Sequence, residues 1–356
     1  MRQLSSAFSL CIKSIFLLSS ILYCYSSYAY DFEAGGIYYN IQSIENLTCV
    51  VTSPKITPPS PGYRPRPNPD LYSGNIVIPQ NPVFRGRTLT VVGIEYCAFY
   101  KCRRLLSVSI PPTVKTIDEE AFCGCENLAI VSGTINASIG INAFAGCRSL
   151  KAIELGKCAT ISQQAFDGCT SLDQIIIPAT VKTIGIEAFA NCGWLSKVEI
   201  KNASSKLTIH CSVFKGSPIN DLYVGRNLTF WTNSSFLPPF EDIVHLSFGD
   251  QVTSIYDDVK GIGEAYATER EIREKHKSVF DREGLKTIVF GKSLTKVPSF
   301  EKANLEKITC RSSIPPVVDG TISFFSIINA ILVVPSGATA SYKSVSPWKD
   351  FSIQEL

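Results

Sequence analysis

Cysteine is the residue whose number and spacing in this sequence most suggest chemistry. There are 13 cysteines in 356 residues, and five of them follow a phenylalanine by three positions. These five are Cys102, Cys125, Cys147, Cys169 and Cys192. Thiols at a recurring position could bind a metal, form disulfides or pack as small apolar groups. Zinc sites combine two short cysteine pairs, and only Cys123 and Cys125 resemble one such pair. The spacing therefore favours packing in a core, with disulfides and a metal site as alternatives.

Groups typical of enzymes are otherwise sparse. The three histidines, His210, His245 and His276, form no HExxH pair, and the sequence has no GxSxG or phosphate-loop motif. Aspartate and glutamate are scattered, without a pair that a fold would obviously bring together. We therefore expect neither an enzyme nor a bound cofactor.

Composition excludes a strongly charged binding protein. Apolar residues make up 45% of the chain and charged residues 18%, which is typical of a globular protein with a core. The formal net charge is +3, and two of the positive residues, Arg2 and Lys13, lie in the first 29 residues. Because the remainder is almost neutral, no overall field would attract nucleic acid or an anionic membrane.

Residues 1–29 are typical of a signal peptide. Arg2 and Lys13 precede an interrupted apolar run, and Ser27 and Ala29 provide the small residues that signal peptidase requires. We expect cleavage after Ala29. Cys24 is a poor lipidation site because the bulky Tyr23 precedes it. No later segment approaches 18 apolar residues, so the mature chain should lack a transmembrane segment and be secreted or held at the cell surface.

An internal repeat runs through the middle of the chain. Ala-Phe strings recur with gaps of 22 or 23 residues, and a sixth phenylalanine follows after 25. These phenylalanines are Phe99, Phe122, Phe144, Phe166, Phe189 and Phe214. Between them lies the pattern L-x-x-I/V-x-I/L, whose last positions alternate as in a strand with one buried face. Good copies continue with I-P-x-x-V-x-x-I, as in Ile110–Ile117 and Ile177–Ile184.

This pattern predicts an α/β repeat, a solenoid of coils of about 22–23 residues. Each coil would add one strand at a spacing of about 4.8 Å, with the Ala-Phe segment forming a short helical turn whose phenylalanine points inward. Neighbouring coils would bury one continuous core. Removing one ring, as in Phe166→Ala, should then destabilise the protein by about 3–5 kcal/mol.

The motif A-F-x-x-C-x-x-L-x-x-I-x-I-P-x-x-V-x-x-I resembles the BspA-type, or Treponema-pallidum-type, leucine-rich repeat. Weaker strand patterns from Ile243, Leu285 and Leu305 extend the array to residues 94–318. The resemblance implies an exported or surface protein, and several family members are adhesins. It implies no particular site residues, because the conserved motif forms the core.

The flanking segments predict caps and one insertion. Residues 30–93 should form an N-terminal β cap, with paired strands from Gly36 and Leu47, a proline-rich loop at 54–69 and a hairpin before the first coil. Residues 257–284 have a seven-residue apolar spacing and many charges, which favours a helical insertion. Residues 319–356 should form a C-terminal cap in which Tyr342 and Trp348 cover the last coil.

A binding surface is expected on the exposed side of the strands, at the third and fifth positions of each strand motif. The candidate binding residues are Glu154, Gln174, Lys197, Glu199, Asp221, Tyr223 and His245. A mixed surface with an exposed tyrosine suits a protein or glycan ligand better than nucleic acid. For His245 alone, the favoured interpretation is a solvated side chain, with ligand contact as the alternative. Five Asn-x-Ser/Thr sequences, at Asn46, Asn136, Asn202, Asn227 and Asn233, are interpreted as chance matches.

The function predicted from these features is that of a secreted or cell-surface recognition protein. It would be an adhesin or ligand-capture module that binds a host or neighbouring-cell macromolecule. The alternative is a structural or assembly component of a cell-surface complex, with the segment 257–284 as a contact for its partner.

Overall fold

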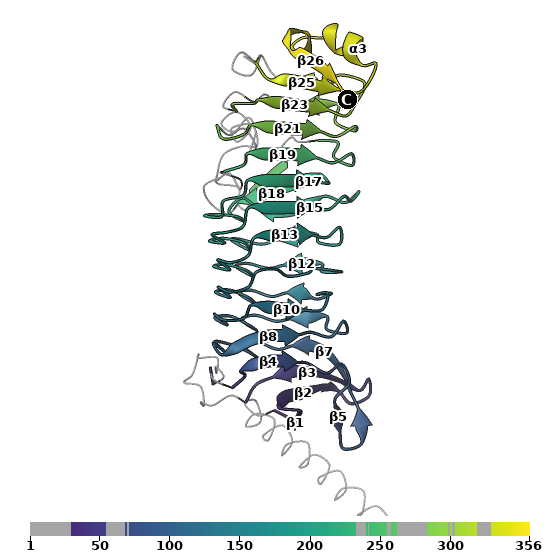
Figure 1. Ribbon diagram of the computed structural model, residues 1–356. Helices are drawn as coiled ribbons and strands as arrows, with labels where there is room; N and C mark the ends of the chain where they lie inside the picture. Colours follow the sequence, from purple (N-terminus) through teal and green to yellow (C-terminus); the bar gives the residue numbers. More distant parts are fainter. Residues whose placement is uncertain are drawn as a thin grey trace, which may run out of the picture.

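The computed structural model describes an elongated β-solenoid of about nine coils (Figure 1). The described residues are 30–54, 68–69, 71–232, 240, 242–254, 258–261, 283–297, 300, 303–318 and 329–356. The expected signal peptide and almost all of the proline-rich loop lie outside them. The coils contribute strands to two sides of the solenoid, and strands of successive coils pair in parallel.

One side of the solenoid is a sheet of eleven strands, antiparallel at its first two pairings and parallel afterwards. In order, its strands are β1 (Phe32–Ala34), β2 (Ile37–Ser43), β3 (Thr48–Thr52), β7 (Thr90–Ile94), β9 (Thr116–Ile117), β11 (Ser138–Ile139), β12 (Thr160–Ile161), β14 (Thr183–Ile184), β16 (Leu207–His210), β18 (Leu228–Thr232) and β20 (Asp258–Gly261). From β9 to β14 these strands occupy the position of the V-x-x-I element in the repeat, and each has a buried isoleucine.

The other side is formed by the L-x-x-I/V-x-I/L elements. A three-stranded sheet contains β10 (Ile130–Ser132), β8 (Leu105–Ser109) and β4 (Gly74–Val77). An eight-stranded sheet follows, with β13 (Gln174–Ile177), β15 (Lys197–Ile200), β17 (Asp221–Val224), β19 (His245–Phe248), β21 (Thr287–Phe290), β23 (Lys307–Cys310), β25 (Ile331–Val334) and β26 (Ser352–Glu355). Two small pairs complete the described strands: β5 (Val83–Phe84) with β6 (Arg87–Thr88), and β22 (Lys296–Val297) with β24 (Val317–Val318).

The phenylalanines of the repeat form one stack along the solenoid axis, called here the phenylalanine stack. Its middle member, Phe166, lies with its ring centroid 5.3 Å from that of Phe144 and 5.1 Å from that of Phe189, with rings parallel within 3°. The stack begins at Tyr72 and Phe99 and reaches Phe214. All six repeat phenylalanines are buried, which confirms that they point inward.

The Ala-Phe segments run as successive tight turns, so the expected helical turn does not form. Phe144 donates its amide hydrogen to the carbonyl oxygen of Ala165 in the next coil, at 2.8 Å. Ala145 donates back to Asn142, three residues earlier, at 3.1 Å. Asn142 itself has a φ of 54°, a left-handed conformation that an α-helix does not admit. Alternate amides therefore bond to the neighbouring coil, and no i to i−4 ladder can develop.

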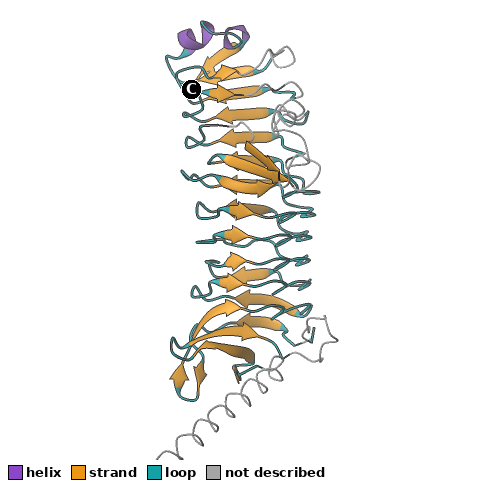
Figure 2. Ribbon diagram, turned by 180° about the vertical axis from the view of Figure 1, so that it is seen from behind, coloured by secondary structure: helices purple, strands orange, loops and turns teal. Residues whose placement is uncertain are grey.

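The α/β class expected from the sequence is therefore wrong in its helical part. In the described ranges, helix is confined to the C-terminal end, as α3 (Thr339–Lys343) and the short 3-10 segment η2 (Trp348–Asp350) (Figure 2). The predicted helical insertion at 257–284 falls mostly outside the described residues. Its first part, Asp258–Gly261, is the strand β20, which pairs with β18 in parallel.

The recurring cysteines are buried beside the phenylalanine stack, and each thiol from the second copy onward donates to the phenylalanine carbonyl of the preceding coil. The Sγ···O distances are 3.0 Å for Cys125 to Phe99, 3.2 Å for Cys147 to Phe122, 3.2 Å for Cys169 to Phe144 and 3.3 Å for Cys192 to Phe166. Ser217 occupies the sixth position and makes the same bond, with its Oγ 2.7 Å from the carbonyl oxygen of Phe189. This position thus requires a small side chain with one donor.

The N-terminal segment differs from expectation in one pairing. β2 and β3 pair with each other, as predicted, and their pairing is antiparallel. The strands β4 and β7, expected to form a hairpin with each other, instead lie in different sheets, where β4 pairs with β8 and β7 pairs with β3 and β9. A short hairpin, β5–β6, lies in the sequence between β4 and β7.

The C-terminal residues have the predicted order of strand, turn and short helix. β25 continues the eight-stranded sheet, and β26 is its terminal strand. Tyr342 and Trp348 are buried and meet edge to face at 6.0 Å. The Tyr342 hydroxyl donates to the carbonyl of Ser312 at 2.9 Å, and the Trp348 indole donates to that of Pro316 at 2.8 Å.

Candidate recognition surface

The outward side of the eight-stranded sheet is called here the strand face, and it faces the viewer in Figure 1. Its strands alternate buried and outward residues because successive side chains of a strand point to opposite sides of a sheet. In β15, Val198 and Ile200 are buried, whereas Lys197 is exposed and Glu199 is partly exposed. Eight strands at about 4.8 Å give this face a length of about 34 Å.

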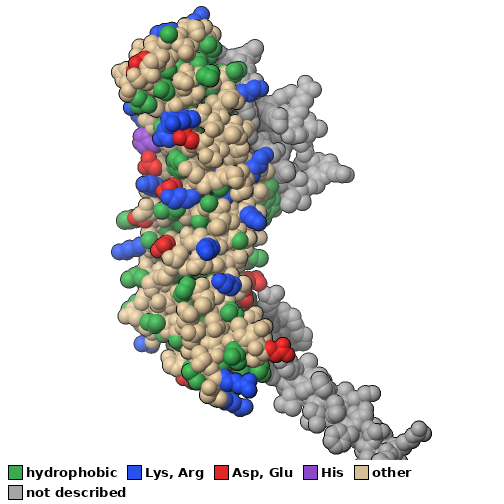
Figure 3. Space-filling view, turned by 90° about the vertical axis from the view of Figure 1, so that its right-hand side faces the viewer, with side chains coloured by type: hydrophobic (Ala, Val, Ile, Leu, Met, Phe, Trp, Pro, Cys, Tyr) green, Lys and Arg blue, Asp and Glu red, His purple; other side chains and the backbone are tan. Residues whose placement is uncertain are grey.

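The register of the parallel strands aligns the outward residues in two rows. The first row contains Gln174, Lys197, Asp221, His245, Thr287, Lys307, Ile331 and Ser352. The second row contains Ile176, Glu199, Tyr223, Ser247, Val289 and Thr309. Along the first row Lys197 stands directly beside Asp221, so opposite charges are neighbours. Figure 3 shows this alternation of acidic and basic side chains in profile along its left edge.

Six of the seven residues selected from the sequence lie together in these rows. The exception is Glu154, whose segment forms only isolated bridges, through Ala152 and Leu155, and no strand. The Glu154 carboxylate accepts a hydrogen bond from the Thr134 hydroxyl of the preceding coil at 3.0 Å. Glu154 is therefore held beside the strand face and is not part of its sheet.

Tyr223 is fixed by a contact that sequence analysis did not anticipate. Its hydroxyl donates to the side-chain oxygen of Asn202, at 2.9 Å. A Cβ at Gly249 would lie 2.4 Å from that hydroxyl and 2.6 Å from the Asn202 oxygen, so glycine is what gives this pair its space. A partly exposed aromatic ring, an amide and glycine backbone thus meet where β15, β17 and β19 end.

Other polar side chains of the face are held by their neighbours. Lys201 forms an ion pair with Glu199, with 2.6 Å between Nζ and Oε1. The His245 ring nitrogen Nδ1 lies 2.8 Å from the Thr287 hydroxyl. These contacts span neighbouring strands or the end of one strand, and they restrain the side chains before any ligand binds, which lowers the entropy cost of binding.

The strand face extends further than the sequence indicated. Thr287 and Lys307 continue the first row past His245, because the strand patterns from Leu285 and Leu305 pair in register with β19. Trp194, three residues before Lys197, is 74% exposed. An exposed tryptophan on a rigid turn is a typical anchor of recognition surfaces. In the sequence, the signal for Trp194 is that an apolar residue stands in a turn between two core positions.

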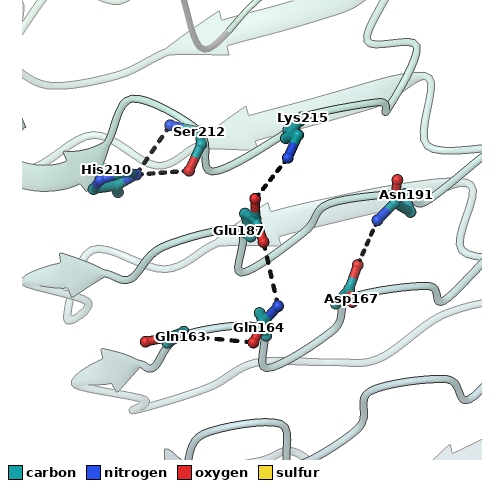
Figure 4. Close-up of polar contacts among 8 residues, drawn as sticks. All are labelled: Gln163, Gln164, Asp167, Glu187, Asn191, His210, Ser212 and Lys215. Carbon is teal, nitrogen blue, oxygen red and sulfur yellow. Dashed lines mark hydrogen bonds and ion pairs between the residues drawn. The ribbon is translucent and has the colours of Figure 1, made fainter. Parts of the chain in front are cut away.

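A second polar array lies on the turns that carry the phenylalanines (Figure 4). Glu187 accepts from Lys215 at 2.9 Å and from Gln164 at 3.2 Å, and Asn191 donates to Asp167 at 2.8 Å. The hydrogen bond and negative charge of Glu187 raise the pKa of Lys215. The groups of this array satisfy one another across successive coils, which makes them a stabilising ladder.

His210 and Ser212 form the closest histidine–hydroxyl pair of the described chain. Nδ1 of His210 lies 2.7 Å from the Ser212 hydroxyl and accepts from the Ser212 amide at 3.1 Å. Both side chains are buried, and the imidazole packs edge to face on Trp231 at 4.4 Å. A substrate could not reach this hydroxyl, so the pair supports the local turn and not nucleophilic catalysis.

The buried thiols are unsuited to metal binding or catalysis. Burial raises the pKa of Cys147 and Cys169 well above its ordinary value and that of Cys192 to about 12, so these groups stay neutral. The eleven described cysteines form no disulfide. Within the described ranges, no three histidine, cysteine, aspartate or glutamate side chains converge on a site for a metal ion. In the same part of the chain, no helix has the length and apolarity to span a membrane.

The repeat is matched by a family model. The model of the BspA-type leucine-rich repeat region matches residues 92–218 and 137–259, in six copies. No curated protein matches the sequence.

Several solved structures resemble the chain. A leucine-rich repeat protein of Bacteroides ovatus is 20% identical, with a TM-score of 0.47, over 92% of this chain and 100% of that one. A leucine-rich cell surface protein of Faecalibacterium prausnitzii is 16% identical, with a TM-score of 0.44, over 91% of this chain and 98% of that one. A leucine-rich repeat protein of T. pallidum is 23% identical, with a TM-score of 0.44, over 71% of this chain and 98% of that one.

Proposed function

Because the chain belongs to the BspA-type leucine-rich-repeat family, we propose that it is a secreted or cell-surface recognition protein whose strand face binds a host or neighbouring-cell macromolecule. The observation that carries this proposal is the alignment of outward residues over a fully buried inner layer. Since the core residues hold the coils together, the outward residues are available for a ligand. We infer a protein or glycan ligand.

The chemistry of the face supports such a ligand. Lys197, Asp221 and His245 offer charged and polar groups on three adjacent strands, and Tyr223 adds a ring that can stack or donate. The two signs of charge are interspersed, so nothing on this face favours a polyanion. Trp194, beside the start of β15, would extend the contact area at the edge.

The test is direct binding of the purified protein to an array of matrix proteins and polysaccharides. The variant K197A/E199A/Y223A removes three neighbouring outward side chains without touching the buried layer. A matched control, K115A/K182A/T183A, removes three exposed side chains near β9 and β14 on the opposite sheet. We expect saturable binding that the first variant loses and the control retains.

Two results would contradict the proposal. Equal binding by the strand-face variant and the unchanged protein would place the ligand elsewhere. Absence of binding to every member of the array, in a folded sample, would favour the assembly role, and stable co-purification with one partner from the source cell would then establish that role.

Export is part of the same proposal. We infer that residues 1–29 direct secretion and are removed after Ala29, without lipidation of Cys24. N-terminal sequencing of the exported protein should then begin at Tyr30. Incorporation of a labelled fatty acid at Cys24 would contradict this processing.

A further inference from the structure

A pocket at the N-terminal end of the solenoid is separate from the strand face. It lies between the hairpin β5–β6 and the loop that joins β2 to β3, and its volume is about 380 Å³. In Figure 1, β5 is at the lower end of the molecule, whereas the strand face occupies the upper half. This volume falls within the range of small-molecule sites, near its lower end.

One wall of this N-terminal pocket is apolar and faces solvent. Ile41, Ile44 and Leu47 line it, and Ile44 is 63% exposed and Leu47 38% exposed. Leu47 has a φ of 52°, in the left-handed region that a leucine rarely adopts. The fold therefore holds aliphatic side chains open to water at a conformational cost, in a cavity that no described side chain fills.

The opposite wall joins an aromatic ring to two guanidinium groups. Phe84 and Arg87 are paired across the hairpin, so their side chains share one face. The turn between them is Arg85-Gly86, with φ values of 48° and 75°. Asparagine or glycine would adopt this turn at lower cost than arginine, so the guanidinium of Arg85 is retained at a conformational penalty. It lies 5.0 Å from the centre of the Phe84 ring.

The two arginines make the rim of the pocket cationic. Both are exposed, and among the described residues no ion pair joins either of them to a carboxylate. Glu45 is the acidic residue of the facing loop, and it is exposed. Guanidinium groups bind carboxylates in a bidentate manner, and their stems can lie along an apolar chain. Figure 3 shows basic side chains gathered beside hydrophobic ones at this lower end.

We propose that the N-terminal pocket binds a single-chain anionic amphiphile of the fatty-acid class. The aliphatic chain occupies the cavity against Ile41, Ile44 and Leu89, and the carboxylate lies at the rim between Arg85 and Arg87. The small volume fits one chain. This site does not depend on the proposed function of the strand face.

The test is calorimetric titration of the purified protein with dodecanoate below its micelle concentration. The variant R85N/R87Q removes both cationic groups, and asparagine tolerates the left-handed turn. The variant I44D places a charge in the apolar wall at an exposed position. Matched controls are R103Q/R104Q and L106D, which alter exposed arginines and an exposed leucine in the next coil. Circular dichroism melts verify that all four variants are folded.

We expect saturable binding of dodecanoate that is at least tenfold weaker in both pocket variants and unchanged in both controls. A cation with the same chain, dodecyltrimethylammonium, should not bind. The proposal is overturned if the unchanged protein does not bind dodecanoate, if the pocket variants bind as well as the controls, or if the cation binds equally. Binding to phosphatidylglycerol vesicles without binding to monomeric dodecanoate would also overturn it, in favour of a membrane-surface site.

Discussion

Removal of one ring from the middle of the phenylalanine stack is the sharpest test of the solenoid core. Phe166 is fully buried and has a parallel ring on each side, at 5.3 and 5.1 Å. Truncation of a buried phenylalanine costs about 3–5 kcal/mol. Because aromatic pairs contribute about 0.5–1.5 kcal/mol beyond their buried area, and two pairs are lost, we expect Phe166→Ala near the upper end of that range.

The assay is urea denaturation followed by circular dichroism, with hydrogen exchange to locate the effect. Each coil contacts only its neighbours, so lost protection should concentrate in the coils of Phe144, Phe166 and Phe189. Phe166→Leu keeps most of the apolar volume but loses both ring pairs, so it should cost about 1–3 kcal/mol and less than the alanine variant. As a surface control, Leu106→Ala should change stability by no more than about 0.5 kcal/mol.

A loss below about 1 kcal/mol for Phe166→Ala, with unchanged exchange, would refute the reasoning, because a ring between two parallel rings in a closed core cannot be removed at so small a cost. Equal effects of the alanine and leucine variants would show instead that ring stacking dominates over buried volume. The double variant with Phe144→Ala should show a coupling energy of about 0.5–1.5 kcal/mol.

Three further predictions concern other parts of the core. Ser217→Ala should lose about 1–3 kcal/mol in urea denaturation, because the hydroxyl both donates to a carbonyl and accepts an amide, whereas Ser217→Cys should be tolerated. Burial raises the pKa of Cys158 to about 11 and that of Cys49 to about 12, so the thiols are neutral in the folded state and ionise in the unfolded state from about pH 9. Stability should therefore fall as the pH rises from about 9 through 11, and constant stability across that interval would contradict this. A Cβ at Gly291 would lie 2.3 Å from a backbone carbonyl oxygen, whereas one at Gly249 meets side-chain ends, so Gly291→Ala should cost about 1–3 kcal/mol in the same assay and more than Gly249→Ala.

The solenoid could be predicted from the sequence because its signal is local and repeated. Gaps of 22 and 23 residues between phenylalanines fix the coil length, and the alternation within L-x-x-I/V-x-I/L fixes which side of each strand is buried. The same alternation placed Lys197, Asp221 and His245 on one face, since parallel strands in constant register align equivalent positions.

The prediction of a helical turn in the Ala-Phe segments was wrong because the geometry of these turns is set by contacts between coils. A left-handed backbone is adopted by Glu120, Gln164 and Glu187. Glutamate and glutamine have no marked preference for this conformation. The amides that would have closed a helix donate instead to carbonyls more than 20 residues away, a partner that a local pattern does not reveal. The pairing of β4 with β8 was missed for the same reason.

The contacts of the face also depend on register. Asn202 and Tyr223 are 21 residues apart, and their hydrogen bond requires that Gly249, in a third coil, leave space for both. The sequence identified Asn202 only as part of an Asn-x-Ser match. No motif joins these three positions, because their proximity results from stacking of coils and not from spacing within one coil.

The hydrogen bond from each cysteine, or from Ser217, to the preceding coil has a consequence for how such a protein can change in length. Each coil from Phe122 to Phe189 supplies one ring and one small donor, and its phenylalanine carbonyl accepts a hydrogen bond from the donor of the next coil. Duplication or deletion of one 22-residue unit therefore leaves every interior partner in place. The span over which a ligand can be held would change by one rung, about 4.8 Å, at each such event. Gene-level recombination between repeats could thus adjust the reach of this molecule in fixed increments without redesign of its interior.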